Sequence, residues 1–132
     1  MNSKIKISIV TPSYNQGAFL ERTIKSVIDQ KHPNIEYIII DGGSTDNSVD
    51  IIKKYKDEVD YWVSENDSGQ YDAIKKGFKK ATGDVLCWIN SDDILLPGSL
   101  NHISNIFENC PNIDVVYGNI YYIDKFDNIV KD

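Results

Sequence analysis

Two adjacent carboxylates, Asp92 and Asp93, follow an uncharged run of strand length at residues 85–89, with Asn90 and Ser91 between. Such a run is typical of a strand buried on both faces of a parallel sheet. The carboxylates would then emerge at the carboxyl end of that strand, where open α/β sheets place their ligands. Carboxylate oxygens suit Mg²⁺ or Mn²⁺, which usually keep several waters and take up substrate phosphates. The segment therefore indicates a metal-phosphate site, with a plain helix-capping turn as the alternative.

A second polar segment follows the first apolar run of the chain and consists of Thr11, Pro12, Ser13 and Tyr14. It combines a rigid bend, small hydroxyl groups and one aromatic ring. The ring of Tyr14 could pack on a nucleoside base, with Thr11 and Ser13 meeting its polar edges. An ordinary strand-to-helix turn explains the same residues, and the segment alone does not decide between the two.

A third segment places Asp41 directly after the run at residues 37–40, which is rich in β-branched residues, and glycines follow at 42 and 43. The carboxylate of Asp41 could accept a hydrogen bond from a base N–H or a ribose hydroxyl. Gly42 has no side chain, so the backbone there can approach a ligand closely. An Asp-Gly turn is the competing interpretation.

Asp72 and Lys76 lie four residues apart on a predicted helix, so they share one face. Lys76 could reach a phosphate and Asp72 a ribose or sugar hydroxyl. A surface ion pair is the alternative. Ala73 and Gly77 are also four apart and give this helix a slim face for close packing.

Apolar periodicity predicts the elements that must position these side chains. Strands are expected at residues 4–10 (ended by Pro12), 37–40, 60–64, 85–89 and 114–117, helices at 17–31, 44–55, 70–82 and 97–110, and a hairpin at 121–130. The alternation predicts an α/β fold, a doubly wound and mostly parallel sheet flanked by helices. Because parallel strands share one direction, loops 11–17, 41–46 and 90–93 should converge on one sheet edge and form a cleft.

Composition limits the classes of partner. The net charge of −6 argues against nucleic acid, because binding a phosphate backbone needs a basic face. Cys87 and Cys110 belong to no metal-ligand pattern, so we expect both to be reduced core residues of a cytosolic protein. His32 and His102 stand apart and are expected to be surface or structural residues. No apolar run has the length of a signal peptide or a membrane span.

Four motifs in one order resemble the nucleotide-sugar glycosyltransferases of the inverting family 2, which have the GT-A (Rossmann-like) fold. They are residues 8–15, 38–46, 69–77, and 81–84 leading to 90–93, and the resemblance extends from about residue 4 to about residue 120. It implies transfer of a sugar from a nucleotide sugar, expected to be a UDP-sugar, to a hydroxyl acceptor with inversion and with help from Mg²⁺ or Mn²⁺.

The resemblance also implies roles for individual residues. Thr11, Pro12, Ser13 and Tyr14 would line a uridine pocket, and Asp41, beside Gly42, would contact the base. Asp72 and Lys76 would lie near the ribose and diphosphate. Asn90, Ser91 and Asp92 would occupy the family's DxD position, with Asp92 as the metal ligand and Asp93 as its neighbour.

The sequence departs from the family pattern in two places. Asn90 replaces the first acid of the DxD motif, so we expect the metal to be held through Asp92 and to need the nucleotide for tight binding. The chain also ends at Asp132, before the half that carries the family's catalytic base and acceptor-binding residues. We therefore expect residues 1–132 to be one domain, the donor-binding part of a longer enzyme, with the base beyond Asp132. Asp114, Asp124 and Asp127 are candidates by position only.

Two other functions are open. A sugar-nucleotide nucleotidyltransferase also uses acidic metal ligands, but its glycine-rich basic loop is missing, since residues 11–17 contain no Lys or Arg. A non-catalytic nucleotide-sugar binding module is the second alternative. The resemblance further implies a glycan, lipid-linked or protein acceptor in polysaccharide biosynthesis, and a cytoplasmic protein with peripheral association at the inner face of the membrane.

Overall fold

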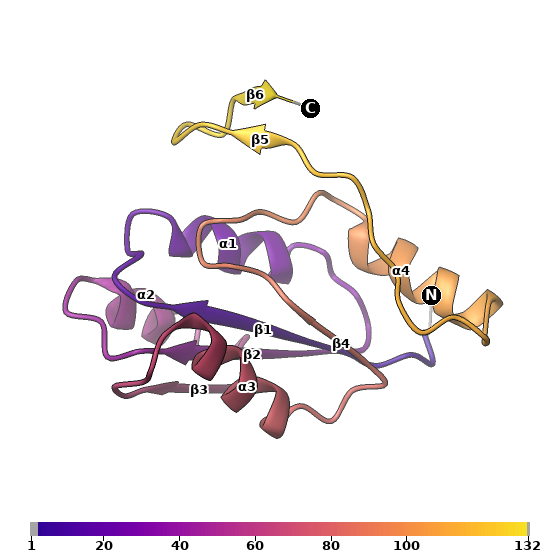
Figure 1. Ribbon diagram of the computed structural model, residues 1–132, viewed down its shortest axis with the longest axis horizontal. Helices are drawn as coiled ribbons and strands as arrows, with labels where there is room; N and C mark the ends of the chain where they lie inside the picture. Colours follow the sequence, from indigo (N-terminus) through magenta and orange to yellow (C-terminus); the bar gives the residue numbers. More distant parts are fainter. Residues whose placement is uncertain (1–2, 132) are drawn as a thin grey trace.

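Four parallel strands form the sheet that carries the candidate site, and they lie in the order β3-β2-β1-β4 (Figure 1). The computed structural model describes residues 3–131. The strands are β1 Ile7–Ser13, β2 Ile35–Asp41, β3 Tyr61–Ser64 and β4 Val85–Trp88. The helices are α1 Leu20–Ile28, α2 Ser48–Lys54, α3 Gln70–Lys80 and α4 Ser99–Asn109. The expected α/β alternation and parallel sheet are confirmed.

Helices cover both faces of this sheet. Helices α1, α2 and α4 contribute Ile24, Ile52 and Leu100 to a core cluster that includes Ile9 of β1 and Ile39 of β2. Helix α3 covers the other face, where its Ala73 packs with buried side chains of β1 and β2, namely Val10, Ile38 and Ile40. The alternation of side chains along each central strand supplies both clusters.

Strand β1 continues through Pro12 to Ser13, so the expectation that Pro12 ends it is wrong. The carbonyl of Ser13 accepts from the N–H of Gly42 at the end of β2, and the carbonyl of Val10 accepts from Ile89 after β4. Successive residues of β1 thus bond to opposite neighbours, and Pro12 is turned toward β4. The β1–β4 pairing ends at Val10 with Trp88, so no ladder bond is lost where Pro12 lacks an N–H.

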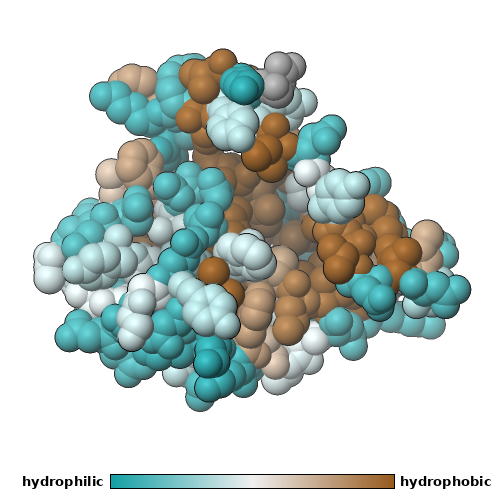
Figure 2. Space-filling view, viewed as in Figure 1, coloured by the Kyte–Doolittle hydropathy of each residue, from teal (hydrophilic) through white to brown (hydrophobic). Residues whose placement is uncertain are grey.

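Strand β4 is half exposed, which corrects the expectation of a strand buried on both faces. Leu86 and Trp88 are 47% and 53% exposed, whereas Val85 and Cys87 pack against the core. Among residues 3–131, β4 pairs with β1 alone and is therefore an edge strand. Figure 2 shows apolar surface running through the middle of the viewed face and out to one side.

Of the strand and the hairpin expected in the C-terminal segment, the described residues form only the hairpin. Residues 114–117 are not a strand, because no strand of the described chain pairs with them. The expected hairpin is confirmed as the antiparallel pair β5 Tyr122–Ile123 and β6 Ile129–Lys131. Figure 1 shows this hairpin standing apart from the sheet.

The two cysteines are free, as expected, but only one lies against the core. Cys87 of β4 is partly buried, and burial raises the pKa of its thiol to about 11. Cys110 follows the last turn of α4 and is exposed, so the expectation of a core position is wrong there. None of the helices in residues 3–131 combines the length and the apolar character needed to span a bilayer.

Candidate functional site

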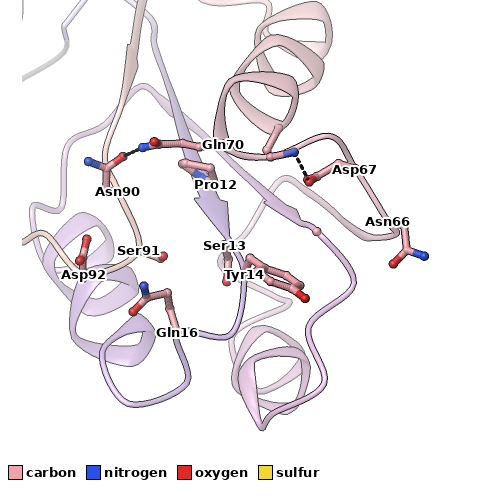
Figure 3. A pocket seen from close by; sticks show the side chains of 13 residues that line it. Pro12, Ser13, Tyr14, Gln16, Asn66, Asp67, Gln70, Asn90, Ser91 and Asp92 are labelled. Carbon is pink, nitrogen blue, oxygen red and sulfur yellow. Dashed lines mark hydrogen bonds between the residues drawn. The ribbon is translucent and has the colours of Figure 1, made fainter.

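A cavity of about 740 Å³ lies at the carboxyl edge of the sheet. That volume is typical of pockets for small molecules and cofactors. Every strand of the sheet contributes to it through the loop that follows, and α3 adds its first turn. The lining residues are Pro12, Ser13, Tyr14, Gln16, Gly42, Asn66, Asp67, Gly69, Gln70, Ala73, Asn90, Ser91 and Asp92, most of which are labelled in Figure 3. The expected convergence of loops on one sheet edge is thus present.

The end of β1 supplies a hydroxyl group and an aromatic ring to the cavity. Ser13 is only 4% exposed, and its Oγ has no hydrogen-bond partner among residues 3–131. A buried hydroxyl without a partner is costly, so this atom is suited to a polar group of a ligand. Tyr14 is 61% exposed and its ring borders the same cavity. The pair offers one hydrogen bond and one stacking surface.

Thr11 and Asp41 are fully buried and are not among the residues that line the cavity. The Oγ1 of Thr11 shares a hydrogen bond of 3.0 Å with the hydroxyl of Tyr37. Neither side chain lines the cavity, and direct contact with a nucleoside stays a prediction for both.

The carboxylate of Asp41 organises the loop after β2. One oxygen accepts from the N–H of Gly43 at 3.1 Å, the N–H of Ser44 at 2.8 Å and the hydroxyl of Ser64 at 2.7 Å. The other accepts from the hydroxyl of Ser44 at 2.6 Å. Four donors match the acceptor capacity of a carboxylate. Asp41 therefore fixes the loop that presents Gly42 to the cavity.

Helix α3 approaches the sheet closely through its small residues, as its sequence predicts. A Cβ atom on Gly77 would collide with the Cγ1 atom of Val10 in β1. Ala73, one turn earlier, is buried and lines the cavity. The close approach brings Gln70 to the cavity, where its amide donates to the Oδ1 of Asn90 (Figure 3).

Asp72 and Lys76 form the surface ion pair that the sequence left as an alternative, and neither lines the cavity. The Nζ of Lys76 lies 3.5 Å from Asp72 and 3.3 Å from Glu65. The N–H of Ser68, followed by the charge of Lys76, lowers the pKa of Asp72. Burial acts to lower the pKa of Lys76, but its hydrogen bond with Glu65 and the charge of Asp72 outweigh this, so that pKa is raised. Contact with a ribose or diphosphate stays a prediction for both residues.

The turn after β4 presents one carboxylate to the cavity and turns the other away. Asp92 is exposed and lines the cavity beside Asn90 and Ser91. Asp93 does not line it, and its Oδ2 accepts from the amide of Asn90 at 3.1 Å. Burial, then repulsion by Asp92, raises the pKa of Asp93 despite that hydrogen bond. Asn90 thus hydrogen-bonds to Asp93 and adds no charge of its own at this turn.

The donor set at this turn fits a divalent cation that brings ligands of its own. Among residues 3–131 there is no cluster of three or more His, Cys, Asp or Glu side chains suited to a metal. Asp92 offers one accessible carboxylate, with the Ser91 hydroxyl nearby. Mg²⁺ in enzymes is commonly held by one or two carboxylates together with water and substrate phosphates. The turn therefore suits a metal-nucleotide complex better than a free metal ion.

Sequence reasoning missed the contribution of β3. Asn66 and Asp67 follow this strand and line the cavity, as does Gln16 after β1. The rule that gave the other three loops, polar residues at the carboxyl end of a parallel strand, applies to β3 as well. The three late acids considered as bases, Asp114, Asp124 and Asp127, lie outside the lining.

The profile of Glycosyl transferase family 2 matches residues 8–132, nearly the whole chain. The chain belongs to glycosyl transferase family 2. A protein of Nostoc sp. strain PCC 7120, named as a glycosyltransferase, is 34% identical over 130 residues, covering 92% of this chain and 40% of its own length. The resemblance seen in the sequence motifs is thereby confirmed.

Solved structures of glycosyltransferases share the fold. S. aureus TarS with UDP-GlcNAc superposes with a TM-score of 0.73 at 23% identity, covering 80% of this chain and 32% of TarS, and this likeness shows the GT-A fold. The Mycobacterium tuberculosis glucosyl-3-phosphoglycerate synthase with Mn²⁺, UDP and glucosyl-3-phosphoglycerate gives a TM-score of 0.52 at 26% identity. The match covers 67% of this chain and 34% of the synthase. This family 2 chain therefore spans about a third to two-fifths of these proteins.

Proposed function

We propose that this family 2 chain binds the nucleoside diphosphate of a sugar donor for a glycosyltransferase reaction. The observation that carries the proposal is the shared cavity, which joins the unpartnered Ser13 hydroxyl, the exposed Tyr14 ring and the Asp92 carboxylate. A base has a flat face and polar edges, whereas a diphosphate needs a counter-charge. One cavity that offers both environments suits a molecule with both parts.

Each lining group has a task in this proposal. Tyr14 stacks on the base, and Ser13 hydrogen-bonds to the nucleoside from the end of β1. Gln70 and Asn90, joined across the cavity, hold α3 against the β4 turn. Asp92 would hold Mg²⁺ or Mn²⁺, an ion that would supply a counter-charge for the diphosphate leaving group.

The solved relatives support this choice of ligand. TarS is solved with UDP-GlcNAc and the mycobacterial synthase with UDP and Mn²⁺. We propose a UDP-sugar as donor, a hydroxyl acceptor, and inversion by direct displacement. The acceptor, a glycan, lipid-linked or protein group, and peripheral association with a membrane belong to the proposal for the whole protein.

The test is calorimetric titration of UDP into the chain with and without Mn²⁺, in the native protein and in Asp92→Asn. We expect the native chain to bind UDP more tightly with Mn²⁺, and the variant to lose this gain, about tenfold or more. Asp50→Asn on the exposed side of α2 is the matched control and should behave as the native chain. Equal Mn²⁺ dependence in native chain and Asp92→Asn would contradict the assignment of Asp92.

The alternative functions differ in their products. A nucleotidyltransferase would release pyrophosphate from a nucleoside triphosphate, whereas a glycosyltransferase releases UDP from its donor. A binding module would return the UDP-sugar unchanged. Chromatography of nucleotide products from the full-length protein with its acceptor separates the three.

A further inference from the structure

We infer that Asp67 reads the base of the donor by accepting its imide N–H, and so selects uracil over cytosine. The inference rests on the proposed function, because it assigns the base end of the same cavity. Asp67 follows β3, lines the cavity and is partly buried there.

The missing side chain of Gly42 makes room for this carboxylate. A Cβ atom on Gly42 would lie 2.9 Å from the Oδ2 and 3.0 Å from the Oδ1 of Asp67. Any larger residue at position 42 would therefore push Asp67 from its place. The carboxylate of Asp67 thus occupies the space directly above the end of β2, beside the loop that Asp41 fixes.

Asp67 retains acceptor capacity that Asp41 lacks. Its Oδ1 accepts from the N–H of Gly69 at 2.9 Å, which orients the side chain at the start of α3. Its Oδ2 accepts no hydrogen bond from residues 3–131, whereas both oxygens of Asp41 are occupied. A carboxylate oxygen facing a cavity is suited to a ligand donor.

The two carboxylates of the cavity lie at opposite ends, and this separates their roles. Figure 3 shows Asp92 and Asn90 on one side, with Asp67 and Asn66 on the other. Under the proposed function a divalent ion would compensate the charge of Asp92, whereas no ion pair within residues 3–131 includes Asp67, and Lys76 of α3 is paired with Glu65 and Asp72. An uncompensated carboxylate repels a diphosphate, so the end with Asp67 suits the uncharged base.

The chemistry of the base edge gives the selectivity. Uracil presents N3–H as a donor between two carbonyl acceptors, and the amide of Asn66 can donate to one of these. Cytosine presents a bare N3, an acceptor that faces the carboxylate without a proton between them. A partly buried carboxylate placed to accept a hydrogen bond rejects a ligand that lacks the donor, since the ligand then covers it without supplying a partner.

The test compares UDP with CDP by calorimetry in the presence of Mn²⁺, for the native chain and Asp67→Asn. An amide at position 67 keeps an oxygen for the N–H of Gly69 and adds a donor that suits cytosine. We expect the native chain to prefer UDP by about tenfold to a hundredfold. In Asp67→Asn the affinity for UDP should fall by about tenfold and the preference over CDP should disappear.

The controls separate this inference from the proposed function. Asp50→Asn should keep the preference of the native chain, and thermal unfolding should show that Asp67→Asn is folded. Native binding of UDP with an unchanged UDP-to-CDP ratio in Asp67→Asn would overturn the role of Asp67 and leave the proposed function standing. Failure of the native chain to bind either nucleotide with Mn²⁺ would overturn both.

Discussion

The side-chain amide oxygen of Asn15 accepts a hydrogen bond of 2.8 Å from the N–H of Thr45, and a longer one of 3.3 Å from the N–H of Asp46. In return, the N–H of Asn15 donates to the hydroxyl of Ser44 at 2.8 Å. Two loops from different strands, one after β1 and one after β2, are thereby locked together. The cavity residues Tyr14 and Gln16 flank Asn15, so this lock also positions them.

Replacement of Asn15 should loosen that lock. Asn15 has φ of 51°, a left-handed conformation that Asn tolerates better than Ala. We expect Asn15→Ala to lower the free energy of unfolding by about 1–3 kcal/mol and to weaken UDP binding. Asn15→Asp retains the acceptor and should lose less in urea unfolding. Equal losses in both variants would argue against the hydrogen bonds as the cause.

Asp41 should be more important for stability than for direct ligand contact. We expect Asp41→Ala to cost about 2–4 kcal/mol in urea unfolding, because it removes the acceptor of Gly43, Ser44 and Ser64. Asp41→Asn keeps one acceptor oxygen and should cost less. A folded Asp41→Ala of native stability would contradict this.

Gly77 should resist enlargement even though alanine favours helices. In Gly77→Ala, the added methyl group meets Val10, and overpacking of this kind costs about 1–3 kcal/mol. The variant Val10→Ala removes the opposing methyl groups, so the double variant should be more stable than the sum of the single losses predicts. Additive losses in a thermal double-mutant cycle would show that the two positions do not touch.

His32 should make the stability of the chain depend on pH. Its Nδ1 accepts from the N–H of Asn34, and its Nε2 bonds the hydroxyl of Ser104 in α4 at 2.9 Å. Burial lowers the pKa of His32, so the unfolded chain binds more protons just below the ordinary value of about 6.5. The contribution of neutral His32 to the free energy of unfolding is therefore complete above pH 6.5. It is lost as the pH falls below 6.5 toward the lowered pKa.

The measurement is the melting temperature between pH 7.5 and pH 5. His32→Gln should show a flatter dependence on pH than the native chain, while His102→Gln, at an exposed position of α4, should follow the native curve. If the melting temperature of His32→Gln depended on pH as steeply as that of the native chain, the pH dependence would belong to other groups.

Local patterns predicted most of the fold because they report the environment of each residue directly. The apolar runs that became β1 and β2 are buried on both faces, as their composition indicates. The run at residues 85–89 has the same character but lies at a sheet edge, where Leu86 and Trp88 are exposed. Composition does not determine which other strand pairs with a given segment. The strand expected at residues 114–117 is absent for the same reason, since no strand of the described chain pairs with that segment.

The sequence by itself determined the family, the parallel α/β architecture and the loops that meet at the site, because motif order and strand direction follow from the chain alone. Only the tertiary structure decided which polar residue of each loop faces the cavity. Asp41 turned inward to four donors, Asp93 turned to Asn90, and Asp67, which lies in none of the four motifs, lines the cavity. The direction of a side chain depends on hydrogen-bond partners brought from distant segments, and these exist only once the strands are assembled.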